Sequence, residues 1–452
     1  MRRKSIDAEK KFNGFQNKFD FMRKKSYNKT VMKRYATAII GGGAAGLFCA
    51  AALGNTEGVL VAERGERAGR KLSATGNGQG NITNLRMSPE HYFHLGGDPA
   101  GITVHALSEY GECDMISFLE SLGGLFLADE RGRVYPAGRQ ASAVTDLLRF
   151  TLARKGVRMQ TQTRVMSLQR QSGRFLLEAE GSEGKETFSA DRVVLCTGGK
   201  AAKNFGTDGS AYALAEGLGH TVTKLYPSLV QLETERGPIR GLKGIRAEAE
   251  LTAYSGQGKG RTRLARVRGD VIFTDYGISG DAVFRLSAFL TEKLAGERIT
   301  ISIGFLPDVP EEKLCSALIR KHDRFPDIPE GELLCGILNN QLGRAVARSC
   351  AEKSAEALAR KAKDFSLSVT GSLGFDSAQV TKGGIPLSEV DETLQSRLVK
   401  GLYFAGEILD VDGECGGYNL QWAYSSARVV AAAIDADGTV PESGFVSRVV
   451  SR

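Results

Sequence analysis

The chain has 452 residues, 42% of them hydrophobic and 25% charged, which is enough for a large core and predicts two or three domains. It contains no run of 18 apolar residues and no apolar segment after its basic start, so we expect neither a membrane span nor a signal peptide. The net charge of +8 comes from residues 1–34, and the near-neutral remainder does not predict a nucleic-acid-binding protein.

Cysteine and histidine usage indicates a reduced protein without a metal site. The seven cysteines include no Cys-x-x-Cys pair, a pattern typical of free thiols in the cytoplasm. The five histidines are scattered, and His91 and His94 lack the partners of a metal site. We therefore predict a cytoplasmic protein that binds no metal.

Residues 1–34 form a basic extension with two interpretations. Apolar side chains recur at helical spacing between Phe12 and Met22, as in a basic amphipathic helix that binds a membrane surface or RNA. The same stretch contains asparagine, glycine and aspartate, which are poor helix formers, and Met32 is an alternative start. We expect a disordered or spurious extension, with a binding arm as the alternative.

Residues 35–64 predict the first unit of a doubly wound parallel sheet of the α/β class. An apolar strand runs into Gly41-x-Gly43-x-x-Gly46 and an alanine-rich helix. Gly41 permits a tight turn, Gly43 lets the backbone approach a pyrophosphate, and Gly46 lets the helix pack on the strand. Ala45, in the first turn of the helix, is expected beside the phosphates, which the helix N–H groups attract.

The second strand of this unit ends at Glu63, 20 residues beyond Gly43. A carboxylate there is placed to accept hydrogen bonds from both ribose hydroxyls of an adenosine, and its charge repels a 2′-phosphate. Arg64 follows directly and is expected at the same site. The motif therefore predicts a dinucleotide other than NADP, with an ordinary glycine-rich turn as the alternative.

Further elements complete this domain. A meander of alternating strands contains Val165, and a buried strand ends in Thr197 and Gly198, where the chain can pass close to a bound cofactor; an ordinary strand-to-turn exit is the alternative. Periodicity predicts helices over 103–122 and 140–155, a helix and turn over 209–222, the meander over 156–191, and the buried strand over 192–197.

The sequence changes character between about residues 225 and 370. Alternating, antiparallel-type strands are followed by a strongly helical stretch with proline-marked connectors, after which the sheet pattern returns. We predict a nucleotide-binding domain interrupted by an inserted one, with a basic extension (1–34), the first part of the FAD-binding domain (35–225), an inserted substrate domain (226–370), the second part of the FAD-binding domain (371–436) and a tail (437–452).

The stretch GLYFAGEILDVDGECGGYNLQWAYSSA, residues 401–427, identifies the dinucleotide. A strand ends at Gly406 and Glu407, a glycine-rich loop reaches Gly417, and a helix opens near Asn419. NAD needs only the first glycine loop, whereas FAD is long enough to reach both ends of the domain. The sequence therefore predicts FAD, with a glycine-rich surface loop as the alternative.

These motifs resemble the bacterial BaiN-like, or aminoacetone-oxidase-like, NAD(P)/FAD-dependent oxidoreductases. The matching stretches run from about residue 36 to 432 and include IIGGGAAGL, GRKLSATGNGQGNITN, VYPAGRQASAV, GDVIFTDYGISGDAVFRLS and DVDGECGGYNLQWA. The resemblance implies a Rossmann-like FAD domain with an inserted barrel-like and helical domain. It also implies reduction of carbon–carbon double bonds, in bile-acid-type enones or in a uridine of 23S ribosomal RNA, which becomes dihydrouridine.

The resemblance further assigns residues to parts of FAD. It implies that the ADP half lies against Gly41, Gly43, Gly46 and Glu63, the phosphates or ring against Arg70 and Lys71, the isoalloxazine along Thr75, Gly76, Asn77 and Gly78, the ribityl–pyrophosphate region against Gly406 and Glu407, and the flavin O2 side against Gly417, Tyr418, Asn419 and Leu420.

Three departures from the family pattern affect the chemistry. The family often has Arg-Cys where this chain has Gln79-Gly80, so a mechanism that uses that cysteine as proton donor does not apply. Asp275 and Asp281 stand near a motif that often carries histidine and proline. Cys415 stands where threonine is common, and it is either a compensating thiol or, with more weight, a small packing residue.

The expected reaction has two halves. NAD(P)H gives hydride to flavin N5, which passes it to an activated C=C bond while an acid protonates the adjacent carbon. Candidate acids are Tyr276, Tyr418, Cys415 and Asp275, and each has a packing or turn-capping alternative. Because no second dinucleotide motif follows a strand, NAD(P)H docks transiently in the inserted domain or electrons come from elsewhere.

A basic stretch in the inserted domain is the candidate contact to ribosomal RNA. Two-residue spacing in a strand places pairs of arginines on common faces, where they can hold phosphates. The favoured alternative is charge that protects an exposed strand edge. The basic residues are Lys259, Arg261, Arg263, Arg266 and Arg268.

Several functions therefore remain open. The leading prediction is an FAD-dependent reductase of a small conjugated substrate, and the second is an enzyme that modifies ribosomal RNA. A non-catalytic or sensory flavoprotein is the third, and an amine oxidase that produces peroxide is a fourth.

Overall fold

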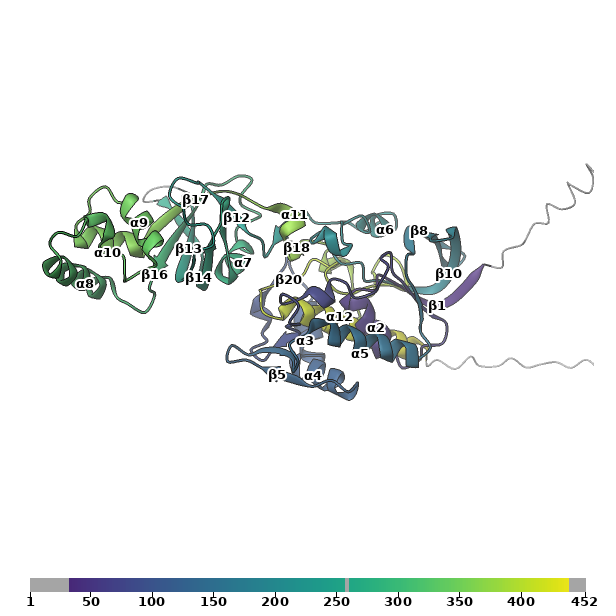
Figure 1. The fold of residues 1–452 in the computed structure, drawn as a ribbon. Coiled ribbons are helices and arrows are strands. Elements are labelled where there is room, and N and C mark those ends of the chain that lie inside the picture. Colours follow the sequence, from purple (N-terminus) through teal and green to yellow (C-terminus); the bar gives the residue numbers. More distant parts are fainter. Residues whose placement is uncertain (1–31, 257–259, 439–452) are drawn as a thin grey trace, which may run out of the picture.

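The computed structural model describes residues 32–256 and 260–438, which form a sheet unit and a barrel unit side by side (Figure 1). The predictions for the basic extension before Met32, for Lys259 and for the tail beyond Gly438 lie outside these residues. Within the described ranges, no helix is both long and apolar enough to cross a membrane.

A mixed, mainly parallel sheet forms the centre of the sheet unit. The strand order is β7-β2-β1-β10-β9-β8, with β19 also beside β10. The pairs of β1 with β2 and β10, of β2 with β7 and of β10 with β19 are parallel, and β8–β9–β10 is the antiparallel meander. The strands are β1 (Lys33–Ile40), β2 (Val59–Ala62), β7 (Arg158–Gln160), β8 (Arg164–Gln171), β9 (Arg174–Gly181), β10 (Gly184–Leu195) and β19 (Leu402–Phe404).

Helices from both ends of the chain pack together beside this sheet. The helix after the glycine loop, α2 (Ala44–Ala52), contacts α5 (Ala141–Arg154) and α12 (Tyr418–Gly438), the last described helix. Its alanine-rich sequence makes this possible, because small side chains let helices approach closely, and residues 45–51 are all buried. Segments from the first and last parts of the described chain therefore meet beside the sheet, which is required for a cofactor that contacts both.

The predicted helix over 103–122 is two helices, α3 (Ile102–Glu109) and α4 (Glu112–Ser121). Gly111 adopts an extended backbone and caps the start of α4, which the low helix propensity of glycine favours. The helical stretch over 311–363 is likewise divided into α8 (Glu311–Arg324), α9 (Asn340–Arg348) and α10 (Ala355–Lys363).

The barrel unit is a closed antiparallel barrel in the order β12-β15-β14-β13-β16-β17. Alternation predicts its inner face: in β16 every second residue from Ile299 to Phe305 is buried. Helices α8, α9 and α10 lie at its far end in Figure 1, and α7 (Asp281–Ser287) packs on β14. The strands are β12 (Leu232–Thr234), β13 (Arg246–Ser255), β14 (Thr262–Phe273), β15 (Gly277–Ser279), β16 (Ile299–Phe305) and β17 (Phe365–Ser372). The predicted fold class, a doubly wound parallel sheet with a meander and an inserted barrel-like and helical part, is confirmed.

The chain passes between the units twice, through β11 (Tyr226–Ser228) and β18 (Val380–Lys382), which pair antiparallel. Short sheets β3-β6-β5 and β4-β20 lie in the sheet unit near α12. The remaining elements are β3 (Thr83–Asn84), β4 (Tyr92–Phe93), β5 (Phe126–Ala128), β6 (Arg133–Pro136), β20 (Asp412–Gly413), α6 (Tyr212–Glu216), α11 (Gly374–Ser377) and the 3-10 turns η1 (Leu72–Ala74), η2 (Pro89–His91), η3 (Lys203–Phe205), η5 (Glu330–Glu332) and η6 (Leu387–Glu389).

Candidate functional site: a cavity between the sheet and the barrel

A cavity of about 1100 Å³ has walls from both units. Its volume lies above the ~300–1,000 Å³ usual for a site that holds one ligand, so a cofactor and a second molecule can share it. The lining residues come from 40–45, 62–81, 133–139, 163–166, 196–214, 229–231, 246–284, 376–380 and 405–423.

The glycine loop after β1 forms one end of the cavity. At Gly41 (φ +104°), an added Cβ would lie 2.5 Å from the carbonyl oxygen of Cys196, and at Gly46 it would lie 2.0 Å from that of Gly41. At Gly43 no atom lies within 4 Å of this position. Gly41 and Gly46 are therefore needed for close packing, whereas Gly43 leaves space that a ligand can fill. Gly41 and Gly43 line the cavity, and Gly46 lies behind them.

The first turn of α2 presents free N–H groups to the cavity. Gly43 is its N-cap and makes no side-chain capping hydrogen bond, and Ala44 and Ala45 line the cavity wall. Unpaired helix N–H groups carry a partial positive charge and attract phosphates. The arrangement fits the pyrophosphate of a dinucleotide.

Glu63 follows β2 and is fixed by two backbone donors. Its Oε2 accepts a hydrogen bond from the N–H of Gly42 at 2.7 Å, and its Oε1 accepts one from Gly65 at 2.6 Å. Because each carboxylate oxygen has a second lone pair, the group can still accept ribose hydroxyls from the cavity, which it lines.

Arg64 and Arg70 close the cavity beside Glu63 and use partners that the sequence did not identify. Arg64 pairs with Asp208 at 3.0 Å, and Arg70 donates to the carbonyl of Asn204 at 2.9 Å. Burial would raise the pKa of Asp208, but hydrogen bonds from Ser210 and then from Arg64 outweigh it and lower the pKa to about 2. Asp208 therefore holds Arg64 in place as an anion at neutral pH.

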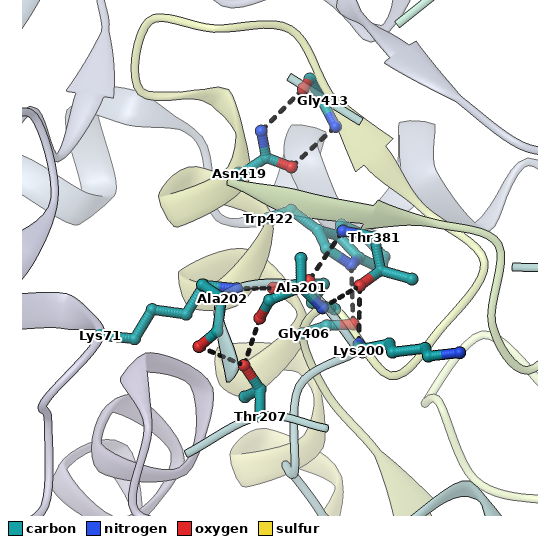
Figure 2. Close-up of polar contacts among 11 residues, drawn as sticks. Lys71, Lys200, Ala201, Ala202, Thr207, Thr381, Gly406, Gly413, Asn419 and Trp422 are labelled. Carbon is teal, nitrogen blue, oxygen red and sulfur yellow. Dashed lines mark hydrogen bonds and ion pairs between the residues drawn. The ribbon is translucent and has the colours of Figure 1, made fainter. Parts of the chain in front are cut away.

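Lys71 and Glu407 join the two ends of the chain across the cavity wall. Lys71 Nζ lies 2.7 Å from Glu407 Oε2, and Glu407 Oε1 accepts the N–H of Thr381 at 2.9 Å. Figure 2 shows the Thr381 hydroxyl accepting in turn from the N–H groups of Lys200 and Ala201, at 2.7 and 2.9 Å. The network ties the end of β10, the start of β18 and the strand end at Gly406 to one another, and Thr381 was not predicted.

The loop after η1 winds in the left-handed region. Gly76, Asn77 and Gly78 have φ of +57°, +53° and +82°, a conformation that glycine and asparagine tolerate best. Thr75 begins the turn, and its hydroxyl donates to the carbonyl of Leu72 at 2.7 Å. Thr75, Gly76 and Asn77 line the cavity, whereas Gly78 does not.

The start of α12 is fixed by reciprocal hydrogen bonds. Asn419 accepts the N–H of Gly413 at 2.8 Å and donates to its carbonyl at 2.7 Å (Figure 2). The carbonyl of Gly406 accepts the indole N–H of Trp422 at 3.1 Å. An added Cβ at Gly417 (φ +105°) would lie 2.5 Å from the Thr83 carbonyl oxygen, so only glycine fits. Residues 406, 417, 419 and 420 all line the cavity.

Two wall residues near the β10 exit support a polar ligand. The Thr197 hydroxyl is buried and has no hydrogen-bond partner among the described residues, and Gly198 follows with φ +68°. Both line the cavity, as does Val165 from β8. A buried hydroxyl without a partner is costly, which a bound polar group would relieve. With the glycine loop, Glu63 and the α12 start, these residues fit FAD.

The four proton-donor candidates are not brought together. Asp275 and Tyr276 lie in the turn between β14 and β15, outside the residues that line the cavity, and Asp275 pairs with Lys243 at the surface. Tyr418 also lies outside the lining: its ring packs 4.4 Å from that of His91. Cys415 lines the cavity, and burial raises its pKa to about 11.

Several polar wall residues had no predicted role. They face the cavity from β6 and its following loop and from the barrel side: Arg133, Tyr135, Arg139, Arg246, Asp270 and Asp281. The first three lie in or beside the stretch VYPAGRQASAV, which carries a resemblance but no motif with a mechanism. The resemblance of this stretch therefore indicated that the segment matters, but it gave no role to these three residues.

Two of the four described arginines in and just before β14 pair with carboxylates. Arg266 pairs with Glu250, and Arg268 pairs with Glu248 at 2.9 Å and with Asp308. The guanidinium of Arg261 lies 4.0 Å from the centre of the Tyr254 ring, and Arg263 pairs with Tyr254 in the β13–β14 register. Such pairing reduces the charge available for phosphates.

Comparison with known proteins agrees with this site. Residues 35–433 match the HI0933-like protein Rossmann domain. The 3-dehydro-bile acid delta(4,6)-reductase of Clostridium scindens is 37% identical, over 87% of this chain and 98% of that protein.

Two further relatives share a different name. Ribosomal RNA dihydrouridine synthases of Escherichia coli and Haemophilus influenzae are each 29% identical, over 88% and 89% of this chain and 97% and 99% of theirs. The protein is an FAD-dependent oxidoreductase. The family that the motifs resemble is thereby confirmed, and the chain belongs to the HI0933-like Rossmann-domain family.

Proposed function

We propose that this protein reduces an activated C=C bond of a small conjugated substrate, with NAD(P)H as the reductant. The observation that carries the proposal is the 37% identity to a delta(4,6)-reductase over nearly the whole of both chains. The cavity supports it, because its walls join the residues that fit FAD to a barrel face that the cofactor would leave free.

The residues that would hold FAD follow the length of the cavity. Glu63 would accept hydrogen bonds from the adenosine ribose, the N–H groups at the start of α2 would donate to the pyrophosphate, and the wall of Asn77 and Asn419 would receive the ring. When bound, FAD supplies hydride transfer. The protein supplies orientation and separation from water, through the hydrogen-bonded network of Lys71 and Glu407 and the fixed start of α12.

The barrel side of the cavity suits an apolar molecule with an anionic or carbonyl group. Ile272 and Phe284 contribute apolar surface, and Arg246 contributes a guanidinium group. Leu229 faces the cavity from the connection after β11, and Arg139 faces it from the loop after β6. Apolar walls with a few polar groups are typical of small-molecule sites. A bile-acid-type enone has both kinds of group.

The test is an anaerobic two-step experiment with the purified, FAD-loaded protein. NADH or NADPH is added first, and bleaching of the oxidised flavin spectrum identifies the reductant. A conjugated 3-oxo bile acid is then added, and we expect the oxidised spectrum to return with one saturated product molecule per flavin. Reduced flavin that no conjugated acceptor reoxidises would refute the proposal.

The second candidate function is reduction of a ribosomal RNA uridine, which the names of the 29% identical relatives favour. The β14 arginines give it limited support because Arg266 and Arg268 pair with carboxylates, which leaves Arg261 and Arg263 as the arginines of this described set without such a pair. Mapping of ribosomal RNA from strains with and without the gene separates the two functions. Loss of a dihydrouridine in the deletion strain would establish the second, and an unchanged map would exclude it.

A further inference from the structure

We infer that the hydroxyl of Tyr135 is the proton donor of the proposed reduction. The inference rests on the proposed function and extends it to a residue that neither the motifs nor the resemblance assigns. It is carried by three observations: the position of the hydroxyl, the commitments of the other acids in the cavity, and the cations beside the ring.

Tyr135 belongs to β6 and lies opposite Leu127 of β5. The side chain is only 6% exposed, yet it lines the cavity. Its hydroxyl has no hydrogen-bond partner within residues 32–256 and 260–438. The oxygen is not one of the fully buried side-chain atoms that lack a partner, so solvent reaches it. A hydroxyl that is open at a cavity wall is available to a ligand.

The cavity carboxylates already serve as acceptors or counter-ions. Asp376, on α11, is the one described lining carboxylate outside this set, and it is exposed to solvent. An oxygen that accepts N–H bonds or balances a cation is not free to donate a proton. The committed groups and their partners are Glu63 with two backbone N–H groups, Asp208 with Arg64, Asp270 with Arg246, Asp281 with Arg285, Glu407 with Lys71 and Glu414 with His91.

Two thiols also line the cavity. Cys196 lies in the core of the sheet unit, where burial raises its pKa well above the ordinary value, and the surroundings of Cys415 favour a packing role. Cys415 packs against an apolar cluster of Leu229, Ala288 and Val380. Burial raises the pKa of its thiol to about 11, and the described residues give its sulfur no hydrogen-bond donor. Arg285 and Arg133 oppose this rise without reversing it, and a thiolate formed there would have no hydrogen bond to stabilise it.

For Tyr135, two guanidiniums lie against the ring itself. Arg139 lies 4.0 Å and Arg133 5.9 Å from the ring centre. Burial raises the pKa of Tyr135, Asp129 acts in the same direction, and both arginines oppose it. The arginines therefore stabilise the phenolate that remains after the proton leaves.

The neighbourhood also relates to the departure at Gln79-Gly80. Arg139 donates to the Gln79 side chain at 3.5 Å, so the residue over the Tyr135 ring is connected to the position where the family often has arginine. At Gly80 (φ +78°) an added Cβ would lie 2.8 Å from Cα of Ala141. A cysteine is therefore excluded sterically at residue 80, and the proton must come from another group.

In the proposed step, hydride that bound, reduced FAD would supply forms a C–H bond at the electron-poor carbon of the substrate C=C bond. The π electrons of that bond form a second C–H bond at the adjacent carbon with the proton of Tyr135, whose O–H bond breaks. The substrate gains two electrons and two hydrogens, and the phenolate regains a proton from solvent.

The test compares Tyr135→Phe with wild type in the two half-reactions. Anaerobic stopped-flow spectroscopy records flavin reduction by NADH or NADPH and then flavin reoxidation by a conjugated enone. We expect reduction within about twofold of wild type and reoxidation slowed by about 10²-fold or more, the usual contribution of a general acid. Tyr254→Phe is the matched control, because Tyr254 also lies 4.0 Å from a guanidinium but outside the cavity.

A second variant keeps the inference testable if the first one misfolds. Arg139 is exposed, so we expect Arg139→Met to fold and to leave flavin reduction unchanged. At saturating enone, where weaker substrate binding no longer limits the rate, we expect it to slow reoxidation about tenfold. If Tyr135→Phe reoxidised at the wild-type rate, or if Cys415→Ala instead lost most of its reoxidation rate, this inference would be overturned. The proposed function would stand in both cases. Reduced wild-type flavin that reacts with no enone would overturn the proposed function and this inference with it.

Discussion

Glu63 has two tasks in this structure. Its two oxygens hold the N–H groups of Gly42 and Gly65, at 2.7 and 2.6 Å, and so set the path of the glycine loop against the end of β2. The same oxygens face the cavity. Loss of the carboxylate therefore affects cofactor binding both directly and through the shape of the loop.

We predict that Glu63→Gln weakens FAD binding. The amide has one acceptor oxygen, and its NH₂ group meets a backbone N–H at either position, so at least one charged hydrogen bond worth ~1.5–3 kcal/mol is lost. The FAD dissociation constant, measured by calorimetry on the apoprotein, should rise about tenfold to a hundredfold. Glu66→Gln is the control, since Glu66 is exposed and outside this cavity, and equal effects in both variants would contradict the prediction.

Single residues differ in how far the sequence reveals them. Glu63 could be predicted because its spacing from Gly43 and its place at a strand end are local. Tyr135 could not, because its role depends on a separate small sheet that folds against the cavity. Asp275 and Tyr276 were chosen for their closeness to a motif in sequence, but the tight turn after β14 holds them away from the cavity wall.

At the scale of elements, β20 places a buried acid next to the connection between the units. Asp412 is fully buried, accepts a hydrogen bond from Ser228 of β11 at 3.0 Å, and leaves its other oxygen without a partner in the described residues. Burial raises its pKa from 3.8 to about 7, although Lys382 and the Ser228 hydroxyl act in the opposite direction. Asp410 and Glu292 raise it further.

The sign of the resulting pH dependence follows from linkage. In the folded chain Asp412 keeps its proton up to about pH 7, whereas in the unfolded chain it loses it near pH 4. The folded state therefore loses relative stability as the pH rises through this interval. We predict that Asp412→Asn removes this slope, so that its thermal midpoint exceeds that of wild type at pH 8 but not at pH 4. Parallel midpoint curves would contradict it, and exposed Asp146→Asn is the control.

Elements were predictable where the period was clear. The parallel strands, α5 and the alternation of the barrel strands follow directly from hydrophobic spacing. The break between α3 and α4 could not be predicted from hydrophobic spacing. Gly111 lies within a helical period, and only its extended backbone shows that it is the N-cap of α4. Pairing between distant strands, such as β11 with β18, also has no local signal.

At the scale of the whole molecule, the two units have separate hydrophobic cores. One core surrounds the parallel sheet and includes Trp422 and Phe48, and the other fills the barrel and includes Phe273 and Phe305. The residues that fit FAD belong to the sheet unit. Cofactor binding should therefore stabilise one core more than the other.

We predict two thermal transitions, of which FAD shifts only one. A ligand at 100 times its dissociation constant stabilises the form that binds it by ~2.7 kcal/mol. Differential scanning calorimetry of apoprotein, with and without excess FAD, should show one transition move upward while the other stays in place. A single transition that moves as a whole would show instead that the two cores unfold together.

The paired strands β11 and β18 have an evolutionary consequence. The barrel leaves and rejoins the sheet unit at one place, so everything from residue 229 to 379 can be exchanged without interrupting a strand of the parallel sheet. Such an exchange would carry Arg246, Asp270 and Asp281 with it and leave the adenosine end unchanged. Replacement of this one contiguous segment could thus change which electron-accepting substrate fits, while the sheet unit that binds the cofactor stays the same.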